Sequence, residues 1–372
     1  MHRRFVNLIM RDLRSSIYSL YRMDIRPLFY ETAEIAAQVQ AAEEAKAKHE
    51  KKNELSMVEE SWKDHPKPAV NFKASNFVTL FRENSIMIGD SFGRTNLLDT
   101  DFKSVVTTPP MRNGKGPNCI CFLIPNPNPL KSKDSQCLYV LDLVPGSSTF
   151  EYPTYLGNND SSRPLVSVPS HYNLDWVWRD LPVPPFVDDP SNCRATMNCS
   201  FMLLDSSTMC VSEEGIGTYT FDMVSRKWSR AGNWALPFCG KAEYVPKLKL
   251  WFALSPPSSP HSLCALDLPA NAMDFESPPD LRHSWDYLHL FDETPYKSHL
   301  VNLGSGKLCV VSFFKTFSSK YVQEDVEDET AVLTGLEVRH CNNSEGSEGA
   351  VRMIKHMSKR CTFEKFGIHR VL

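Results

Sequence analysis

Few short segments of this 372-residue chain carry residue types that could do chemistry. Gly89-Asp-Ser-Phe-Gly93 matches G-x-S-x-G, the nucleophile elbow of hydrolases, in which a strand precedes the serine and a helix follows it. Ser85–Ile88 could supply the strand, but Arg94–Asp99 also has the character of a strand. The pattern therefore predicts a hairpin turn around Ser91, and a nucleophilic serine is the alternative.

Motifs for phosphates and metals are incomplete. Gly215-Ile-Gly217 begins like a dinucleotide fingerprint, but Thr220 stands where its third glycine belongs, and Gly114-Lys-Gly116 lacks the Walker spacing. Cys119 and Cys121 would share one face of a strand, but no second pair lies at zinc-finger spacing. The other candidates are scattered: Cys193, Cys199, Cys210, His340, Cys341, Cys361 and His369. We expect core thiols and surface imidazoles, and hence no catalytic residue, metal site or cofactor.

Tryptophans are the best candidates for contact with a partner. Trp176 and Trp178 lie two residues apart in the Pro-rich stretch Leu174–Phe186, so on a strand both would point to one face. One interpretation is a structural edge strand. The other is an exposed anchor for a protein, because Trp, Tyr and Arg dominate interface energetics. We take this pair as the candidate partner-binding residues, and expect Trp228 to pack in the core between sheets.

The elements that must position these residues recur along the chain as an apolar or Tyr-containing strand that ends in aspartate. The recurring residues are Asp24, Asp99, Asp142, Asp222 and Asp267. Their separations correspond to one or two units of roughly 37 to 45 residues, the length of a four-stranded propeller blade. Leu336–His340 could be a further copy, with His340 in the aspartate position. Each carboxylate can accept hydrogen bonds from backbone N–H groups of the turn that follows.

Apolar strands lie between these repeat marks, and turn-forming residues follow them. They are Phe77–Phe81, Cys119–Ile124, Phe201–Leu204, Leu248–Leu254 and Lys307–Phe314. The sequence predicts an all-β fold, a β-propeller of about five or six kelch-like four-stranded blades. A β-sandwich or two unrelated β domains is the alternative. We expect the strand Arg3–Met10 to close the ring against Val351–His356 and so remove free sheet edges.

One segment departs from the β pattern. Glu31–Lys52 is rich in Ala, Glu, Lys and Gln, which favours a helix, and Glu44 and Lys48 are spaced to support a solvated one. We expect residues 31–66 to form a helical or flexible insertion within a single propeller domain of residues 1–372. A docking helix for a partner is the alternative.

Bulk properties narrow the function. A net charge of −3 gives no electrostatic case for nucleic acid or anionic membrane, and no apolar run has the length of a membrane span. Met1–Arg11 has too short an apolar stretch for a secretory signal. Eleven scattered cysteines indicate reduced thiols, so we expect a cytoplasmic or nuclear protein that is not secreted and is monomeric.

Two stretches of the sequence resemble known families. The run from Thr218 to Phe238 resembles a kelch-type blade, although it lacks the Gly-Gly doublet of kelch repeats. Arg3–Ile9 and Ala242–Phe252 more closely resemble an uncharacterised group of plant proteins, abundant in grasses, that are kelch-like or F-box-associated propellers. The resemblance implies a propeller and a substrate-recognition or adaptor role in ubiquitin transfer. No F-box is recognisable ahead of the first strand.

Together these observations predict a non-catalytic protein-interaction module that binds unidentified protein partners. The alternative is an oxidase or hydrolase that uses the central channel of the propeller. That alternative requires several histidines to converge at one mouth of the channel, and the candidates are His171, His261, His283 and His299.

Overall fold

A computed structural model gives the fold of most of the chain. It describes residues 3–15, 17–49, 60–61, 67–73, 76–82, 84–125, 136–143, 149–155, 176–188, 199–256, 261–268, 278–286, 294–317, 327–341 and 350–372. Two compact units contain them. Unit 1 comprises Met1–Lys73, Pro237–Pro269 and Pro279–Leu372, and unit 2 comprises Ala74–Leu236 and Ala270–Pro278.

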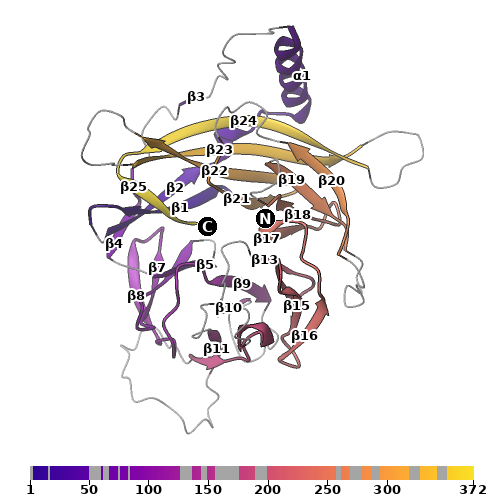
Figure 1. Ribbon diagram of the computed structural model, residues 1–372. Coiled ribbons are helices and arrows are strands. Elements are labelled where there is room, and N and C mark those ends of the chain that lie inside the picture. The colour runs from indigo at the N-terminus through magenta and orange to yellow at the C-terminus, as the bar shows by residue number, and fades with distance from the viewer. Residues whose placement is uncertain are drawn as a thin grey trace. The chain divides into compact units, whose positions relative to one another are not determined.

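Unit 2 is built from antiparallel groups of four strands, each connected in chain order (Figure 1). The first group is β5 (Phe77–Arg82), β6 (Ser85–Gly89), β7 (Thr95–Asp99) and β8 (Ser104–Thr108). The second is β9 (Ile120–Pro125), β10 (Gln136–Asp142), β11 (Thr149–Tyr155) and β12 (Trp176–Asp180), and the 3₁₀ turn η2 (Pro185–Asp188) follows it. The third is β13 (Ser200–Leu203), β14 (Thr208–Glu213), β15 (Gly217–Asp222) and β16 (Lys227–Gly232).

Unit 1 repeats this plan with longer strands. One group is β17 (Cys239–Val245), β18 (Leu250–Leu254), β19 (Ser262–Leu266) and β20 (Leu281–Asp286). The next is β21 (Lys297–Gly304), β22 (Lys307–Phe317), β23 (Glu327–His340) and β24 (Val351–Phe363), with the short β3 (Glu60–Ser61) beside β24. The last has the order β25-β1-β2-β4, from β25 (Phe366–Val371), β1 (Phe5–Asp12), β2 (Ile17–Asp24) and β4 (Val70–Lys73). The described strands thus form an all-β protein of several four-stranded antiparallel groups.

The expected partner of the N-terminal strand was wrong. β1 pairs with β25 rather than with Val351–His356, for example through Leu8 opposite Val371. Val351–His356 instead begins β24, which pairs with β23 along most of its length. A turn at Glu364 and Lys365, in which Lys365 adopts the left-handed conformation (φ 64°), then connects β24 to β25, which belong to different sheets. The strand that reaches β1 is therefore the one after that turn.

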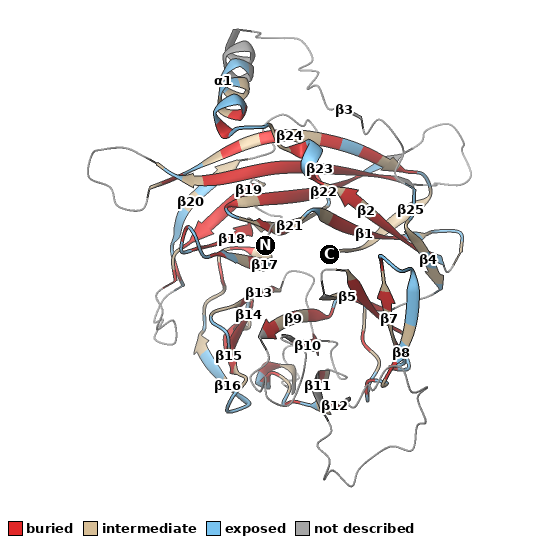
Figure 2. Cartoon of the chain, turned by 180° about the vertical axis from the view of Figure 1, so that it is seen from behind, coloured by how far each residue is buried: buried red, intermediate tan, exposed pale blue. Residues whose placement is uncertain are grey.

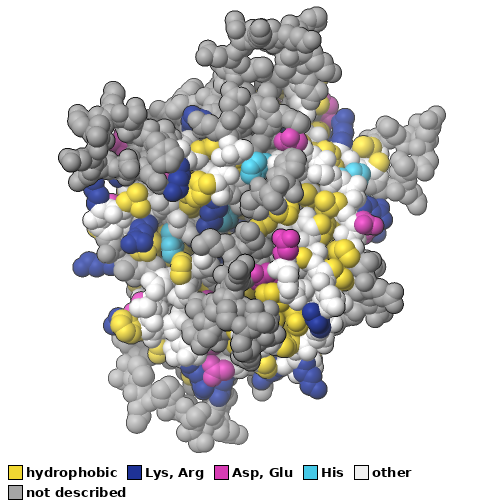
Figure 3. Space-filling view, viewed as in Figure 1, with side chains coloured by type: hydrophobic (Ala, Val, Ile, Leu, Met, Phe, Trp, Pro, Cys, Tyr) yellow, Lys and Arg dark blue, Asp and Glu magenta, His cyan; other side chains and the backbone are white. Residues whose placement is uncertain are grey.

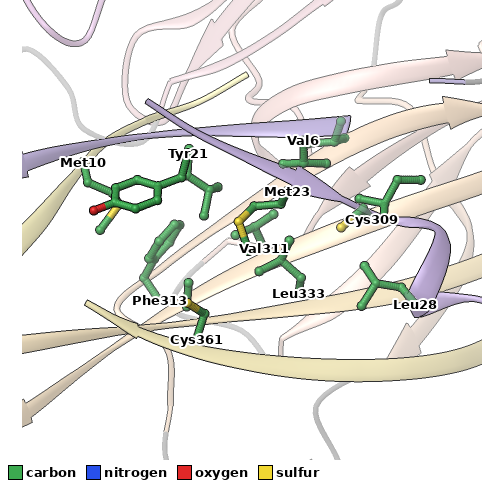
Figure 4. Packing of buried hydrophobic residues seen from close by; sticks show 14 of the residues in the cluster. Val6, Met10, Tyr21, Met23, Leu28, Cys309, Val311, Phe313, Leu333 and Cys361 are labelled. Carbon is green, nitrogen blue, oxygen red and sulfur yellow. The ribbon is translucent and has the colours of Figure 1, made fainter. Parts of the chain in front are cut away.

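Buried side chains form a separate core between neighbouring sheets of each unit. In unit 1, side chains of β1 and β2, with Leu28 of the 3₁₀ turn η1 (Arg26–Leu28), point toward those of β22, β23 and β24 (Figure 4). β22 and β23 are buried along most of their described length (Figure 2). In unit 2, Phe122, Phe150 and Phe221 are fully buried in one cluster, with ring centroids of Phe150 and Phe221 5.1 Å apart. Apolar residues alternating along the strands account for these cores.

The insertion predicted at residues 31–66 is described only in part. α1 spans Ala33–His49, and its first turns pack on β24, where Ala33 and Ala36 are buried against Ile354. Ile35 is 40% exposed, so the apolar face of the helix is narrow. The side chains of Glu44 and Lys48 lie outside the described residues. Among the described helices, none has the length and apolar character to cross a membrane.

Candidate functional site

A groove of about 780 Å³ lies at the end of β23 in the described part of unit 1. The start of β24, the first turn of α1 and the turn between β17 and β18 complete its walls. Its lining residues are Glu34, Lys247, Leu248, Glu337, Val338, Arg339, His340, Cys341 and Arg352. We call this feature the β23 groove.

Backbone hydrogen bonds fix the walls of the β23 groove. The N–H of Val338 donates to the carbonyl of Gly306 at 2.8 Å. Gly306 has φ +83°, and a Cβ there would lie 2.5 Å from the carbonyl oxygen of Val338, so only glycine fits this approach. Across the groove, the N–H groups of Leu248 and Lys249 both donate to the carbonyl of Val245 at 3.0 Å. The two walls are therefore held by main-chain contacts rather than by mobile side chains.

A buried carboxylate anchors the floor. Glu337 is 5% exposed and accepts from Arg339 Nε at 2.6 Å and from His356 Nε2 at 3.1 Å. The backbone N–H of Tyr30 donates to His356 Nδ1 at 3.2 Å, so the proton of the neutral imidazole lies on Nε2 and points at Glu337. Burial lowers the pKa of His356, which keeps the ring neutral at pH 7. The floor is thus a satisfied polar network.

Positive charge exceeds negative charge along the groove. Three cationic side chains, Lys247, Arg339 and Arg352, line it together with the carboxylates of Glu34 and Glu337. Arg339 pairs with both carboxylates and reaches Glu34 at 3.3 Å across a solvated gap. Lys247 and Arg352 are exposed. Because solvated pairs contribute little to stability, the excess charge remains available to an anionic ligand.

His340 occupies the aspartate position that the repeat predicts at the end of β23. Its Nε2 lies 3.3 Å from the carbonyl oxygen of Lys247, which can only accept, so Nε2 carries the proton of that hydrogen bond. The N–H of the next residue, Cys341, donates to the carbonyl of Ala350 at 2.8 Å. The titratable groups on the floor are thus engaged in structural contacts, and the arrangement offers cations and hydrogen-bond donors for binding.

The candidate partner residues Trp176 and Trp178 lie on β12, an edge strand of its sheet. Trp178 is 2% exposed and its Nε1 donates to the carbonyl of Pro109 at 3.0 Å. The side chain of Trp176 lies outside the described residues. The burial of Trp178 favours the structural edge strand, and a partner role for the pair stays a prediction.

Trp228 packs on aromatic rings of unit 2. Its ring centroid lies 5.0 Å from that of Phe221 and 6.3 Å from that of Phe150, and its Nε1 donates to the carbonyl of Pro182 at 2.7 Å. It therefore joins an edge strand to the core of its sheets.

The repeat aspartates have more than one role. Those at the ends of β2, β7 and β15 accept from N–H groups of the following turn, as in Asp222 with Val224 at 2.8 Å and Ser225 at 2.7 Å. Asp267, directly after β19, pairs instead with Arg282. Asp142 ends β10, the second strand of its group, whereas the other four follow a third strand in sheet order.

The remaining sequence candidates that the structure describes lie in strands or in turns beside them. Ser91 lies in a turn between β6 and β7, where Asp90 accepts from the N–H groups of Phe92 and Arg94 at 2.9 Å, and a strand follows rather than a helix. His283 stacks on Trp285 in β20. The other histidines proposed for a channel are His261, before β19; His299, in β21; and His171, which lies outside the described residues.

The cysteines and the possible metal ligands are the other candidates for chemistry. Cys119 and Cys121 have their sulfur atoms 3.8 Å apart, and the ten cysteines that the structure describes are thiols outside any disulfide. Cys193 lies outside the described residues. Within the described ranges, His, Cys, Asp and Glu form no group of three or more placed to hold a metal.

Sequence reasoning missed a buried ion pair in unit 2. Lys115 Nζ lies 2.8 Å from Glu151 Oε1, and both side chains are fully buried. The pair fastens the loop before β9, because Glu151 also accepts from the N–H groups of Arg112 at 2.9 Å and Asn113 at 3.1 Å. Gly114-Lys-Gly116 does not fit a phosphate loop, yet a lysine between two glycines was the one available signal of a tightly folded loop.

The fold and the β23 groove together define the class of the protein. It is an all-β protein of four-stranded antiparallel groups with a cationic groove at the end of a strand. The chain belongs to the family described as "Protein of unknown function (DUF1668)", whose model matches residues 3–362. The search of curated proteins found no match.

Several solved structures are similar at low sequence identity. One is a protein of unknown function from Bacteroides thetaiotaomicron, at 12% identity and a TM-score of 0.34, covering 68% of this chain and 54% of that one. The chain thus spans about half the length of that relative. Another is the β-propeller domain of Cps50 (Swd1) from Myceliophteria thermophila, at 9% identity, a TM-score of 0.34, and 71% and 80% coverage. A third is the C-terminal WD40 domain of Sif2, at 9% identity, a TM-score of 0.35, and 90% and 78% coverage. At these scores the similarities carry no argument about fold or function.

Proposed function

We propose that the chain is a non-catalytic protein-interaction module built as a six-bladed β-propeller. Three four-stranded groups in each unit supply six blades of the kind that a propeller repeats. Pairing of β1 with β25 places the first and last described strands in one sheet, which is how a ring of blades would close. The proposal narrows the expected five or six blades to six.

The single observation that carries the binding role is the β23 groove. Its walls are held by main-chain hydrogen bonds, and its floor by the Glu337–His356 contact, so a ligand would meet a preorganised surface. Lys247 and Arg352 are exposed there and provide an excess of positive charge. Such a surface suits recognition of an anionic group on a protein.

A catalytic role has less support. Nucleophilic or general acid–base catalysis needs a nucleophile within hydrogen-bond reach of a base that a third group orients. At the groove, the imidazole of His340 donates to the carbonyl of Lys247, and that of His356, which is buried, donates to Glu337, which itself binds Arg339. The central-channel enzyme therefore stays an alternative without a supporting site among the described residues.

The narrower parts of the hypothesis rest on sequence. An adaptor or substrate-recognition role follows from the resemblance to F-box-associated propellers, and a cytoplasmic or nuclear location from the cysteine content. We retain both as proposals, together with a monomeric state.

Quantitative affinity purification from cells of the source organism tests the module. Lys247→Glu reverses one exposed charge of the groove, and Lys227→Glu, at the exposed start of β16, is the matched control. We expect a small set of proteins to be retained by the wild type and the control and depleted at least about tenfold by Lys247→Glu. Equal recovery by both variants, or no specific protein with the wild type, would contradict the proposal.

A further inference from the structure

The outer side of β24 is covered in an unusual way. β23 pairs with one side of the strand, while the only described strand on the other side is β3, which pairs in parallel through Lys359 and Arg360. Nearer its start, the N–H of Lys355 donates to Gln40 Oε1 of α1 at 3.3 Å. The Gln40 side chain and a two-residue strand thus stand where a sheet would place a full-length strand. The ribbon shows α1 and β3 beside β24 (Figure 1).

Among the described side chains of α1, a small apolar cluster and the exposed pair of Glu34 with Arg339 hold the cover. Ala33 and Ala36 of α1 are buried with Ile354 and flanked by Tyr30, and this small cluster is the described apolar contact of the helix. Tertiary packing of an apolar face supplies most of the stability of a helix in a protein, and this small cluster provides little of it to α1. β3 pairs with β24 in parallel through two residues, so it adds little to the stability of the cover.

Charge on β24 indicates what could replace the cover. The thirteen residues Val351–Phe363 contain four Lys and Arg side chains and no Asp or Glu. They are Arg352, Lys355, Lys359 and Arg360. Arg352 and Arg360 are exposed and Lys355 is partly exposed, and Arg352 also lines the β23 groove. On the face drawn in Figure 3, by contrast, Lys and Arg side chains of the described residues are scattered.

We propose that the outer edge of β24 binds an extended acidic peptide segment of a protein partner as an added strand. α1 and β3 are the displaceable cover of this edge. Strand addition derives affinity from main-chain hydrogen bonds and specificity from alternate side chains, and acidic side chains of the added strand would lie beside the cations of β24. One end of the peptide would reach the β23 groove through Arg352. The inference rests on the proposed interaction function and specifies its partner.

Fluorescence polarisation on the full chain with a synthetic probe tests the strand. The probe is a labelled octapeptide of alternating Glu and Val, which combines charge with β propensity. The first control carries N-methyl groups on every backbone amide, so it keeps the charges but has no backbone N–H group to donate to β24. The second alternates Lys and Val. We expect the plain acidic peptide to bind at least about tenfold more tightly than either control.

Variants then locate the site. Lys355→Glu/Arg360→Glu reverses two edge charges and should weaken binding at least about tenfold, whereas Arg14→Glu/Lys227→Glu, at exposed positions elsewhere, should not. Ala36→Glu places a charge at a fully buried position, so it should release α1 and tighten binding several-fold. Hydrogen exchange of residues 33–40 reports that release, and circular dichroism checks the fold of each variant.

The outcomes separate the two proposals. Equal binding of the plain and N-methylated peptides would mean that charge attraction alone holds the peptide, and would overturn strand addition. No binding of the plain peptide would overturn it too. If partner proteins are nevertheless retained and depleted by Lys247→Glu but not by the edge variant, the interaction module stands and the β24 inference is wrong. If Ala36→Glu releases α1 without tightening binding, α1 is not the cover.

Discussion

The buried pair of Lys115 and Glu151 gives a prediction about stability that can be worked from its contacts. Lys115→Met leaves a buried carboxylate that keeps two backbone donors, from Arg112 and Asn113, and we expect a loss of about 3 kcal/mol in the free energy of unfolding. Glu151→Leu strands a buried ammonium with Thr149, its partner at 2.6 Å, and also orphans both N–H groups. We therefore expect about 5 kcal/mol or more for that change.

The double variant decides whether the two charges interact. Lys115→Met/Glu151→Leu removes both charges and leaves only the two N–H groups unsatisfied, at about 1–3 kcal/mol each. It should therefore be more stable than Glu151→Leu alone, with a coupling of several kcal/mol between the sites. Lys227→Met, at an exposed lysine of the same unit, is the matched control and should change stability by less than about 0.5 kcal/mol.

Equilibrium urea unfolding at pH 7, followed by tryptophan fluorescence, measures these differences. Trp178 reports on the same region, because its Nε1 donates to the carbonyl of Pro109 at the start of the loop that Lys115 fastens. A double variant whose loss equals the sum of the two single losses would refute the reasoning, since independent sites add and paired buried charges do not.

Three further predictions follow from single contacts. Burial lowers the pKa of His299 to about 3 and that of His369 to about 4, so below about pH 6.5 the unfolded chain binds more protons. The free energy of unfolding should thus fall by about 2 kcal/mol per histidine between about pH 7 and pH 5. In the variant His299→Gln/His369→Gln, the urea concentration at the unfolding midpoint should change less with pH. Gly114→Ala should cost about 2 kcal/mol or more in a thermal melt, because its Cβ would lie 2.0 Å from the carbonyl oxygen of Ser91; an unchanged Tm would contradict that approach. Trp178→Phe should cost about 1–3 kcal/mol through the lost Nε1 hydrogen bond and lost packing, and no loss in urea would place the ring in solvent.

Local patterns in the sequence predicted the strands because each is a short-range property. Alternation of apolar and polar residues predicts a half-buried strand, and the Asp222 turn needs only the N–H groups of its own next residues. The partner of β1 was not predictable in the same way. Both Val351–His356 and Phe366–Val371 have strand character, and the turn at Lys365 decides which of them reaches β1.

The candidate site was missed for a related reason. Glu34, Lys247, Glu337 and Arg352 are far apart in the sequence, and no motif spacing joins residues that meet only when a helix, a turn and two strand ends come together. Trp178 illustrates a different difficulty, because the same-face spacing of two tryptophans on a strand fits a buried pair and an exposed pair equally well. Whether a tryptophan packs inward depends on residues such as Pro109, 69 positions away.

His340 connects the repeat to the proposed site. Asp24, Asp99 and Asp222 follow a third strand in sheet order, and their carboxylates satisfy N–H groups of a tight turn. At the equivalent end of β23, an imidazole replaces the carboxylate and bonds to the carbonyl of Lys247 on a different strand pair. A carboxylate there could not donate to that carbonyl and would offset the positive charge of Lys247 and Arg352. The departure from the repeat is therefore what keeps this strand end cationic, and His340→Asp should weaken binding of the acidic octapeptide while His340→Gln, which can still donate, should preserve it.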